Sequence, residues 1–291
     1  MKSAIFYTYD KDITLDEDKV TTRRFHPCGD HTLASKGFVA PLGEELLYKA
    51  TGKVFGKVKF ENKDVPSSVV KELTVVAVSK VSEEAGRKLS KKEVSGIQEG
   101  VVHKLLPKCF TKSKEVLFVQ DIKNKLLVII NASPKQADDV VAMLREVHGT
   151  LPVQPLSTEE DPINIMTDAL VDSSKLKETN ITLGGKVQLE DNQGNKVSWT
   201  EDLHSASVNG IIEEGKTVSK MAIEVDGLVE LTVDQHNNFS GIKISKAIMQ
   251  KPEEDEDPIV AEEANLLICA DELIKVRKEV NEWFGGITLN E

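Results

Sequence analysis

The residues best suited to chemistry stand in one short segment, His26-Pro27-Cys28-Gly29-Asp30-His31, which holds two imidazoles, a thiol and a carboxylate. A structural zinc site usually takes four ligands in closely spaced pairs, and the other cysteines, Cys109 and Cys269, stand in unrelated surroundings. A cysteine nucleophile needs an imidazole that a third group orients. The proline and glycine fit a turn around a small buried cysteine equally well. We therefore expect neither a catalytic residue nor a metal site.

Motifs for nucleotide binding and acyl transfer are also missing. The sequence contains no GxxxxGK[ST] loop, no GxGxxG fingerprint and no GxSxG elbow. This pattern predicts a protein that does not use ATP and needs no cofactor.

Charge is unevenly distributed along the chain. The formal net charge is −11, which taken alone argues against nucleic acid, because duplex binding draws on lysine and arginine to neutralise phosphates. Residues 71–114, however, carry ten cations against five acids, whereas residues 252–291 carry twelve acids against three cations. This split suggests that one surface meets an anion and another does not. The alternative is that both segments form ordinary solvated faces.

Four cations of the basic segment are spaced so that a helix would place them on one face able to touch a phosphate track. They are Arg87, Lys88, Lys91 and Lys92. The alternative is local pairing, of Glu83 with Arg87 and of Glu84 with Lys88, four residues apart. Such pairs are too weak to prevent contact with phosphate.

Two helices are expected to position these cations. Pro66 suits the first position of a helix that runs to about Gly86. Ser90 and Glu93 fit a capping box, and apolar residues then recur on one face of a second helix that Pro107 stops. Residues 66–106 therefore predict a helical hairpin, with the cations near its tip.

The rest of the first half alternates strands and one helix. We expect a strand within 3–15, a hairpin within 44–61, and a hairpin of 116–121 with 126–131 that is buried on both faces. A helix follows from Ser133, an N-cap, to Gly149. The proline-containing segment 151–157 is typical of a connection between domains.

The second half begins with polar sequence to about residue 180 and continues with antiparallel strands. The expected strands are 181–190 with 194–199, 217–225 with 228–234, and 239–246. The expected helices are 201–214 and about 260–284, with an acidic linker at 252–258 before the last. The fold class is therefore α+β, with mixed or antiparallel sheets, packed helices and a protruding helical hairpin.

The composition is that of a soluble globular protein. Apolar residues make up 40% and charged residues 29% of the 291 positions, and no apolar run reaches the roughly 18 residues needed to cross a bilayer. Acidic residues stand where a signal peptide would have its apolar stretch. Three widely separated cysteines favour reduced thiols. We expect a cytoplasmic protein without membrane contact.

Several segments together carry a resemblance to a known family. They are 87–133, Phe25-His26-Pro27-Cys28-Gly29, Gly37-Phe38-Val39-Ala40-Pro41-Leu42-Gly43, Pro66-Ser67-Ser68-Val69-Val70-Lys71 and Leu151-Pro152-Val153-Gln154-Pro155-Leu156-Ser157. In these segments the chain resembles the RdgC family of recombination-associated bacterial proteins. The resemblance implies a ring-shaped homodimer that encircles double-stranded DNA, restrains RecA, has no enzymatic activity and associates with the nucleoid.

The resemblance also assigns roles to residues of the first half. Phe110 matches the gate at which two subunits meet to close the ring, although an aromatic at such a corner is most often core. Lys108 matches a basic position that is often arginine in the family, so lysine here gives up the bidentate binding of phosphate. Arg87 matches a basic residue of the family's helical finger. We add Lys112 to the expected DNA-binding residues.

In the second half the resemblance is thinner. Lys216 and Lys220 match family positions that could face the hole of the ring, and solvated lysines at a strand edge are the alternative. Positions where relatives carry basic residues are here Val197, Trp199 or Thr200, which weakens the expected DNA contact of this half. The C-terminal helix either caps its own domain or, as the resemblance favours, forms a dimer contact.

We therefore expect two regions. Residues 1–157 form an N-terminal α+β region that includes the helical finger and gate segment, 66–114, and residues 158–291 form a C-terminal α+β dimerisation region. The predicted function is sequence-nonspecific binding of double-stranded DNA by a homodimeric ring that restrains RecA-dependent recombination. The alternative is a protein–protein adaptor of the recombination or replication machinery with little DNA affinity. An enzyme using the region of Cys28 ranks third.

Overall fold

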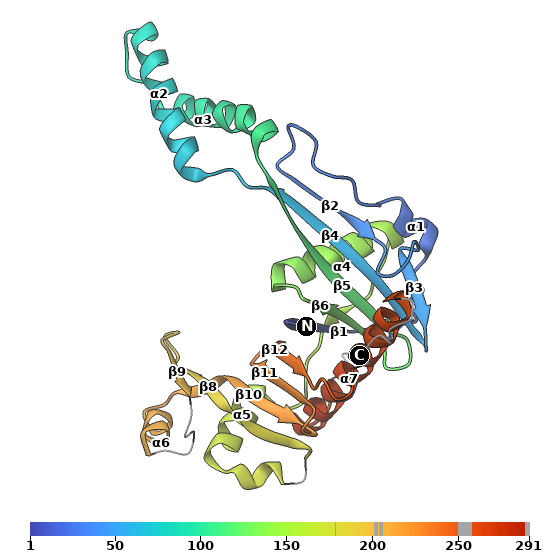
Figure 1. Ribbon diagram of the computed structural model, residues 1–291. Coiled ribbons are helices and arrows are strands. Elements are labelled where there is room, and N and C mark those ends of the chain that lie inside the picture. Colours follow the sequence, from blue (N-terminus) through green and yellow to red (C-terminus); the bar gives the residue numbers. More distant parts are fainter. Residues whose placement is uncertain (178, 201–202, 204–205, 250–257, 289–291) are drawn as a thin grey trace. The chain divides into compact units, whose positions relative to one another are not determined.

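The computed structural model describes residues 1–288 except 178, 201, 202, 204, 205 and 250–257, and it confirms an α+β fold with a large antiparallel sheet (Figure 1). The helices are α1 (Glu17–Thr21), α2 (Ser67–Ala85), α3 (Lys91–Leu105), α4 (Pro134–His148), α5 (Pro162–Val171), α6 (Ala206–Glu213) and α7 (Pro258–Trp283), with 3₁₀ turns η1 (Leu106–Lys108) and η2 (Ser173–Leu176). The strands are β1 (Ser3–Thr8), β2 (Ala34–Val39), β3 (Leu47–Ala50), β4 (Lys53–Lys63), β5 (Thr111–Asp121), β6 (Leu126–Ile130), β7 (Gln154–Pro155), β8 (Ile181–Glu190), β9 (Lys196–Thr200), β10 (Thr217–Val225), β11 (Val229–Asp234) and β12 (Phe239–Ile244).

Contacts within the chain delimit two compact units. Unit 1 comprises Met1–Val20, Ala40–Lys57 and Val116–Glu291, and unit 2 comprises Thr21–Val39 and Val58–Glu115. Strands β4 and β5 contribute residues to both units. The division of the chain into 1–157 and 158–291 stays a prediction, since these contacts separate a unit inside the first region rather than mark a boundary at residue 157.

In unit 1 the hydrogen-bonded strands follow the order β5-β6-β1-β12-β11-β10-β8-β9. Strand β1 is central, because Ala4 pairs with Ile130 of β6 on one side and with Phe239 of β12 on the other. Its continuous apolar sequence fits a strand that is buried on both faces. The expected hairpin of β5 with β6 is confirmed and is buried over 116–121 and 126–130, apart from the half-buried Leu117, but β5 begins at Thr111 rather than at 116.

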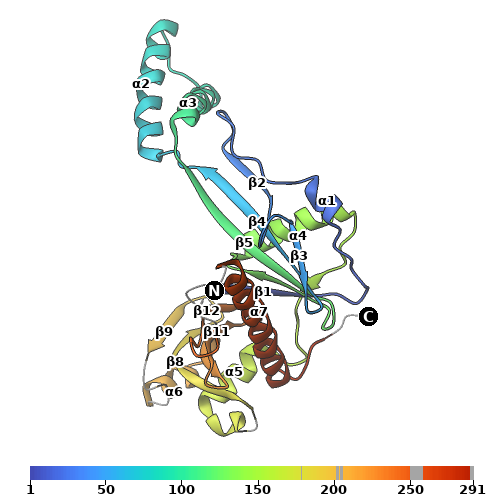
Figure 2. The same ribbon diagram turned by 45° about the vertical axis from the view of Figure 1, so that its right-hand side comes forward.

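Helices α5 and α7 complete the core of unit 1. Met166 and Leu170 of α5 share one apolar cluster with the strands and with Leu273 and Val276 of α7. Figure 2 shows α7 lying beside β11 and β12. No helix of the described residues is long and apolar enough to span a membrane.

Helix α5 corrects the sequence-based expectation that 158–180 is merely polar. Asp161 is its N-cap and accepts a 2.9 Å hydrogen bond from the amide of Ile163, and Pro162 occupies the first helical position. These two residues are a recognised start signal for a helix. Part of the expected helix 201–214 is seen as α6, while residues 201, 202, 204 and 205, and the linker at 252–257, lie outside the described residues.

Two glycines are required by close packing. A Cβ atom on Gly37 would lie 2.4 Å from the backbone Cα of Phe25 in unit 2. A Cβ atom on Gly56 would lie 2.2 Å from the ring of Phe118 in unit 1. Both segments run so close to their neighbours that no side chain fits.

Candidate nucleic-acid interface

The loop between α2 and α3 in unit 2 carries the first predicted cations. Helix α2 ends because Gly86 adopts a left-handed conformation with φ of 65° and donates its N–H to the carbonyl of Glu83. Ser90 then caps α3 by accepting a hydrogen bond from the amide of Glu93, and the expected capping box is confirmed. Arg87 and Lys88 therefore lie in the loop and Lys91 and Lys92 in the first turn of α3, so the four cations do not share one helical face.

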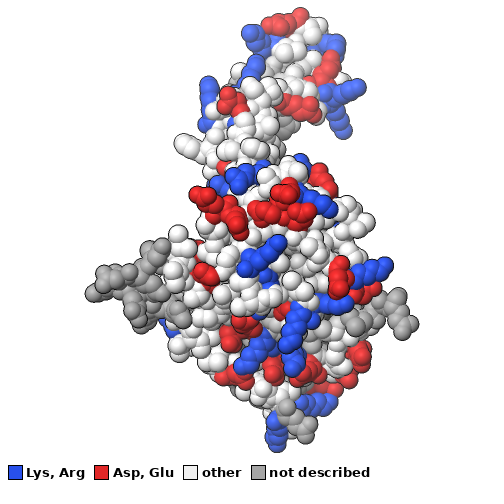
Figure 3. All heavy atoms as spheres, turned by 90° about the vertical axis from the view of Figure 1, so that its right-hand side faces the viewer, with Lys and Arg blue, Asp and Glu red and all other residues white. Residues whose placement is uncertain are grey.

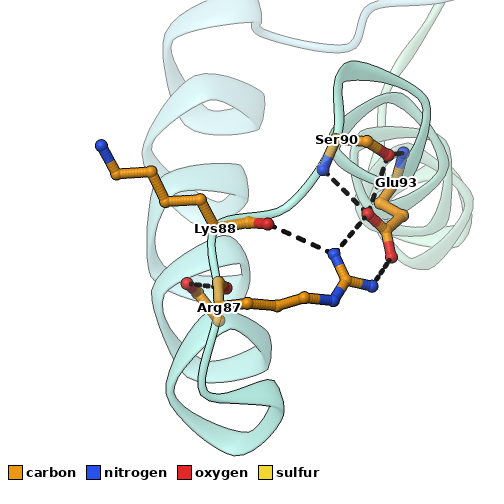
Figure 4. A network of polar contacts seen from close by, with 5 residues as sticks. Arg87, Lys88, Ser90 and Glu93 are labelled. Carbon is orange, nitrogen blue, oxygen red and sulfur yellow. Dashed lines mark hydrogen bonds and ion pairs between the residues drawn. The ribbon is translucent and has the colours of Figure 1, made fainter.

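Arg87 pairs with a carboxylate that the sequence analysis did not assign to it. Its guanidinium donates to both carboxylate oxygens of Glu93, at 2.7 and 3.1 Å, and to the carbonyl of Lys88 at 3.2 Å (Figure 4). This bidentate pair, together with hydrogen bonds from Ser90, lowers the pKa of Glu93 to about 2. The alternative of local pairing named Glu83 as the partner of Arg87, because it assumed a continuous helix.

The three lysines of this segment remain exposed. Among the residues that the structure describes, Lys88, Lys91 and Lys92 make no ion pair, and the side chain of Lys88 points away from Glu93 (Figure 4). Lys91 and Lys92 occupy a helix N-terminus, where the helix dipole disfavours cations and favours anions. Figure 3 shows basic and acidic side chains interspersed over the face of α2 and α3 in view. These lysines are therefore open to an anionic ligand, although Ser90 and Glu93 already cap the amides at this helix end.

Phe110 lies beyond the far end of α3. Turn η1, which contains Pro107, ends the helix, and the carbonyl of Phe110 accepts a 2.8 Å hydrogen bond from the amide of Asp64. Phe110 is 87% exposed, so within this chain it is not a core residue. A single exposed apolar side chain is common on protein surfaces, so the role of Phe110 as a gate rests on the resemblance and stays a prediction.

The remaining predicted cations of unit 2 differ in whether an acidic side chain pairs with them. Lys108 is exposed, whereas Lys112 on β5 lies 2.6 Å from the carboxylate of Asp64. Helix α3 has 15 residues and is therefore about 22 Å long. The structure thus places Arg87, Lys88, Lys91 and Lys92 together at one end of α3, and Lys108, Phe110 and Lys112 beyond its other end.

In unit 1, Lys216 and Lys220 have different surroundings. Lys216 has a side chain only 17% exposed, and its ammonium lies 2.7 Å from the carboxylate of Asp191. This contact, followed by bonds from Asn195, lowers the pKa of Asp191 and ties the turn between β8 and β9 to the start of β10. Lys220 is exposed on β10. Of the two, Lys220 is the one open to a ligand.

Cys28 directly precedes a turn over residues 29–32, in which the amide of Thr32 donates to the carbonyl of Gly29. The amide of Cys28 donates to a carboxylate oxygen of Glu61 at 2.8 Å, and burial raises the pKa of the thiol. The ring of His31 stacks on that of His103 with centroids 4.2 Å apart. A protonated thiol is a poor nucleophile. Among the described residues no group of three or more His, Cys, Asp or Glu side chains is arranged to hold a metal.

Sequence reasoning missed two features of unit 2. One is the pairing of Arg87 with Glu93. The other is an exposed apolar face on α2 formed by Val69, Leu73 and Val76, which recur at helical spacing on one side. The even mix of apolar and polar residues around α2 was the available indication that not all of its valines could be buried.

The similarity to known proteins extends over nearly the whole chain. A family model described as "Putative exonuclease, RdgC" matches residues 1–287. A relative from Mannheimia succiniciproducens, named recombination-associated protein RdgC, is 28% identical over 293 residues, spanning 98% of this chain and 97% of the relative. Relatives with the same name from Yersinia enterocolitica and Salmonella typhimurium are 28% and 29% identical over 297 residues, with the same coverage.

Proposed function

The chain belongs to the RdgC family, and from this premise we propose that it binds double-stranded DNA without sequence preference, as a homodimer that closes a ring around the duplex and restrains RecA. The observation that carries the proposal is the group of exposed lysines around the α2–α3 loop, Lys88, Lys91 and Lys92. Lysines at a helix N-terminus attract phosphate oxygens and read no base edges. Binding is therefore sensitive to salt and indifferent to sequence.

The other cations contribute unequally in this proposal. Lys108 and Lys220 are exposed and available to phosphates. Lys216 reaches a phosphate only by leaving Asp191, whereas Lys112, whose side chain is 76% exposed beside Asp64, can contact a phosphate without losing a buried partner. Arg87 adjoins the lysine group but is engaged with Glu93.

Ring closure in this proposal uses two contacts between copies. One lies in the C-terminal region, 158–291, where α7 exposes Ile259 and Val260 near its N-terminal end. The other is a gate at Phe110, within the finger and gate segment 66–114. The gate is the weaker contact, and it opens to admit DNA and recloses around it. Such a ring holds DNA topologically and, by covering the duplex, limits the access of RecA in the nucleoid.

The proposed activity includes no cleavage of DNA, although the family description contains the word exonuclease. An end-labelled duplex incubated with the protein and Mg²⁺ or Mn²⁺ tests this point. We expect the labelled strand to keep its full length while it is bound. Shortening that depends on the divalent cation and is abolished by EDTA would contradict a purely binding role.

A second candidate function is a protein–protein adaptor with little DNA affinity. Two observations favour it: the net charge of −11, and the exposed apolar face of Val69, Leu73 and Val76 on α2. In this case the protein would act on recombination through a partner that covers that face.

The experiment that separates the two candidates is a titration of a fluorescent random-sequence duplex, followed by anisotropy across a salt series. Binding that weakens steeply with salt and does not depend on sequence supports the proposed function. An unrelated duplex of the same length and a size-exclusion profile of the protein serve as controls. Absence of binding even at low salt would favour the adaptor.

A further inference from the structure

The chain contains two capping boxes that differ at the third helical residue, which is Glu93 in α3 and Gln136 in α4. On α4, Ser133 accepts from the amide of Gln136, and the amide of Ser133 donates to the side chain of Gln136 at 3.2 Å. On α3, Ser90 and Glu93 make the same pair of contacts. The α4 box demonstrates that a neutral amide is sufficient to cap a helix in this protein. The carboxylate of Glu93 is therefore not required by the cap alone.

The additional partner of Glu93 is Arg87, which lies across the loop. The guanidinium donates to both oxygens of Glu93, and its own backbone carbonyl accepts a 2.7 Å hydrogen bond from the hydroxyl of Ser82. The fork of Arg87 is thus folded back onto the protein (Figure 4). A guanidinium uses this same planar edge to bind a phosphate bidentately, so a carboxylate and a phosphate compete for it.

We propose that Glu93 is an internal competitor for phosphate: it masks Arg87 in the α2–α3 loop and thereby limits the affinity of the loop for duplex DNA. This inference rests on the proposed DNA binding and adds to it a residue that sets its strength. The masked pair contributes no net charge, and the exposed cations beside it are Lys88, Lys91 and Lys92. A ring that must move along DNA gains from contacts that are individually weak.

A double variant that keeps the net charge of the chain tests the masking of Arg87. The double variant Arg87→Ala/Glu93→Gln removes one positive and one negative charge, keeps the net charge of the chain and retains a capping residue of the type found at Gln136. It should bind a duplex within about twofold of the unmodified protein, with the same salt dependence. If Arg87 contacts phosphate in the unmodified protein, the double variant should instead bind more weakly, with a salt slope smaller by about 0.9.

Glu93→Gln alone should free Arg87. We expect its affinity for a random-sequence duplex to rise at least about fivefold, and its salt slope to steepen by about 0.9, which corresponds to one more neutralised phosphate. Glu83→Gln is the matched control, since it removes the same charge from an exposed position at the end of α2. Equal gains in the two variants, or a gain by Glu93→Gln that survives in the Arg87→Ala background, would overturn the proposal.

A second polyanion separates failure of this inference from failure of the proposed function. Elution from immobilised heparin should require more salt for Glu93→Gln than for Glu83→Gln, whether or not the protein binds DNA. If the unmodified protein does not bind a duplex but this order on heparin holds, the proposed function fails while the masking of Arg87 stands. If the order on heparin is absent, the masking is wrong. Circular dichroism of each variant verifies that α3 remains folded.

Discussion

The backbone carbonyl of Phe110 accepts a 2.8 Å hydrogen bond from the amide of Asp64, while the residue as a whole is 87% exposed. The backbone bond fixes the position of the residue where β4 ends and β5 begins, and the ring takes no part in the core. The side chain can therefore be removed without disturbing the fold. This separation makes Phe110 a suitable residue with which to test the proposed gate.

Phe110→Ala should weaken the retention of DNA and leave stability unchanged. An exposed side chain outside the core changes the free energy of unfolding by about 0.5 kcal/mol or less. If Phe110 is an anchor of the gate, its removal should speed dissociation from a closed circular plasmid roughly tenfold or more, as for an interface hot spot. The measurement is release from the plasmid after a competitor is added.

Ile122→Ala is the control for the gate, because Ile122 is also an exposed apolar residue but lies in the turn between β5 and β6. It should leave the dissociation rate unchanged. Equal release by both variants, or unaltered retention by Phe110→Ala with an intact dimer, would remove Phe110 from the gate.

Replacing Lys88, Lys91 and Lys92 together by alanine should lower the affinity for DNA and flatten its dependence on salt. The salt slope should fall by about 0.9 for each phosphate that these lysines neutralise in the unmodified protein. The control is a triple alanine variant of three exposed lysines from other segments, namely Lys11, Lys123 and Lys135. Since the two variants have the same net charge, a difference between them reports position rather than total charge. Identical slopes would exclude the α2–α3 loop from the DNA site.

The boundaries of α2 and α3 could be predicted from sequence because the residues that set them act locally. Gly86 supplies the left-handed conformation that ends α2, Ser90 and Glu93 form a box within one turn, and Pro107 cannot continue α3. The hairpin of β5 with β6 was likewise predictable from two apolar runs. Each of these predictions depends on residues that are close together in the chain.

The contacts of the predicted cations could not be predicted from local sequence. Arg87 meets Glu93 only because a loop turns the chain back on itself, and Lys216 meets Asp191 across two strands, 25 positions away. Helical spacing predicts neighbours on one helix and is silent on contacts that the tertiary fold creates. For this reason the sequence identified the cations but not which of them remain available to a ligand.

The pairing of Asp191 with Lys216 predicts reduced stability in acid. The pKa of Asp191 is lowered in the folded protein, so folding favours its ionised form. The resulting contribution is complete above the ordinary aspartate pKa of about 3.9 and is lost as the pH falls through the lowered folded value. Asp191→Asn should therefore unfold at a lower urea concentration at pH 6, and the difference from the unmodified protein should shrink towards pH 2.

Lys216→Ala should act on the same turn rather than on DNA binding. We expect it to lower the urea midpoint at pH 6 and to leave the DNA affinity within about twofold, since the side chain of Lys216 is only 17% exposed and its ammonium contacts Asp191. Lys220→Ala, at an exposed position of the same strand, is the comparison. A larger drop in DNA affinity in Lys216→Ala than in Lys220→Ala would contradict this assignment.

Arg277 in α7 is fully buried against two aromatic rings that contact each other, and it lies near no carboxylate that could pair with it among the described residues. Its guanidinium carbon lies 4.9 Å from the ring centroid of Phe239 and 5.4 Å from that of Phe6, and the group donates to the carbonyl of Asn237 at 2.9 Å. Burial lowers the pKa of this guanidinium. The charge therefore costs desolvation, which the two rings and the carbonyl of Asn237 offset only in part.

The stability of variants at Arg277 should consequently depend on the shape of the new side chain rather than on its charge. Arg277→Met keeps the volume of the stem that packs in this part of the core and removes the buried charge, so its free energy of unfolding should stay within about 1 kcal/mol of that of the unmodified protein. Arg277→Ala leaves a cavity and should cost about 3 kcal/mol or more. Arg277→Lys retains a charge without the planar fork and should be less stable than Arg277→Met. Urea unfolding measures all three, and a lysine variant as stable as the unmodified protein would show that the charge itself is what this position requires.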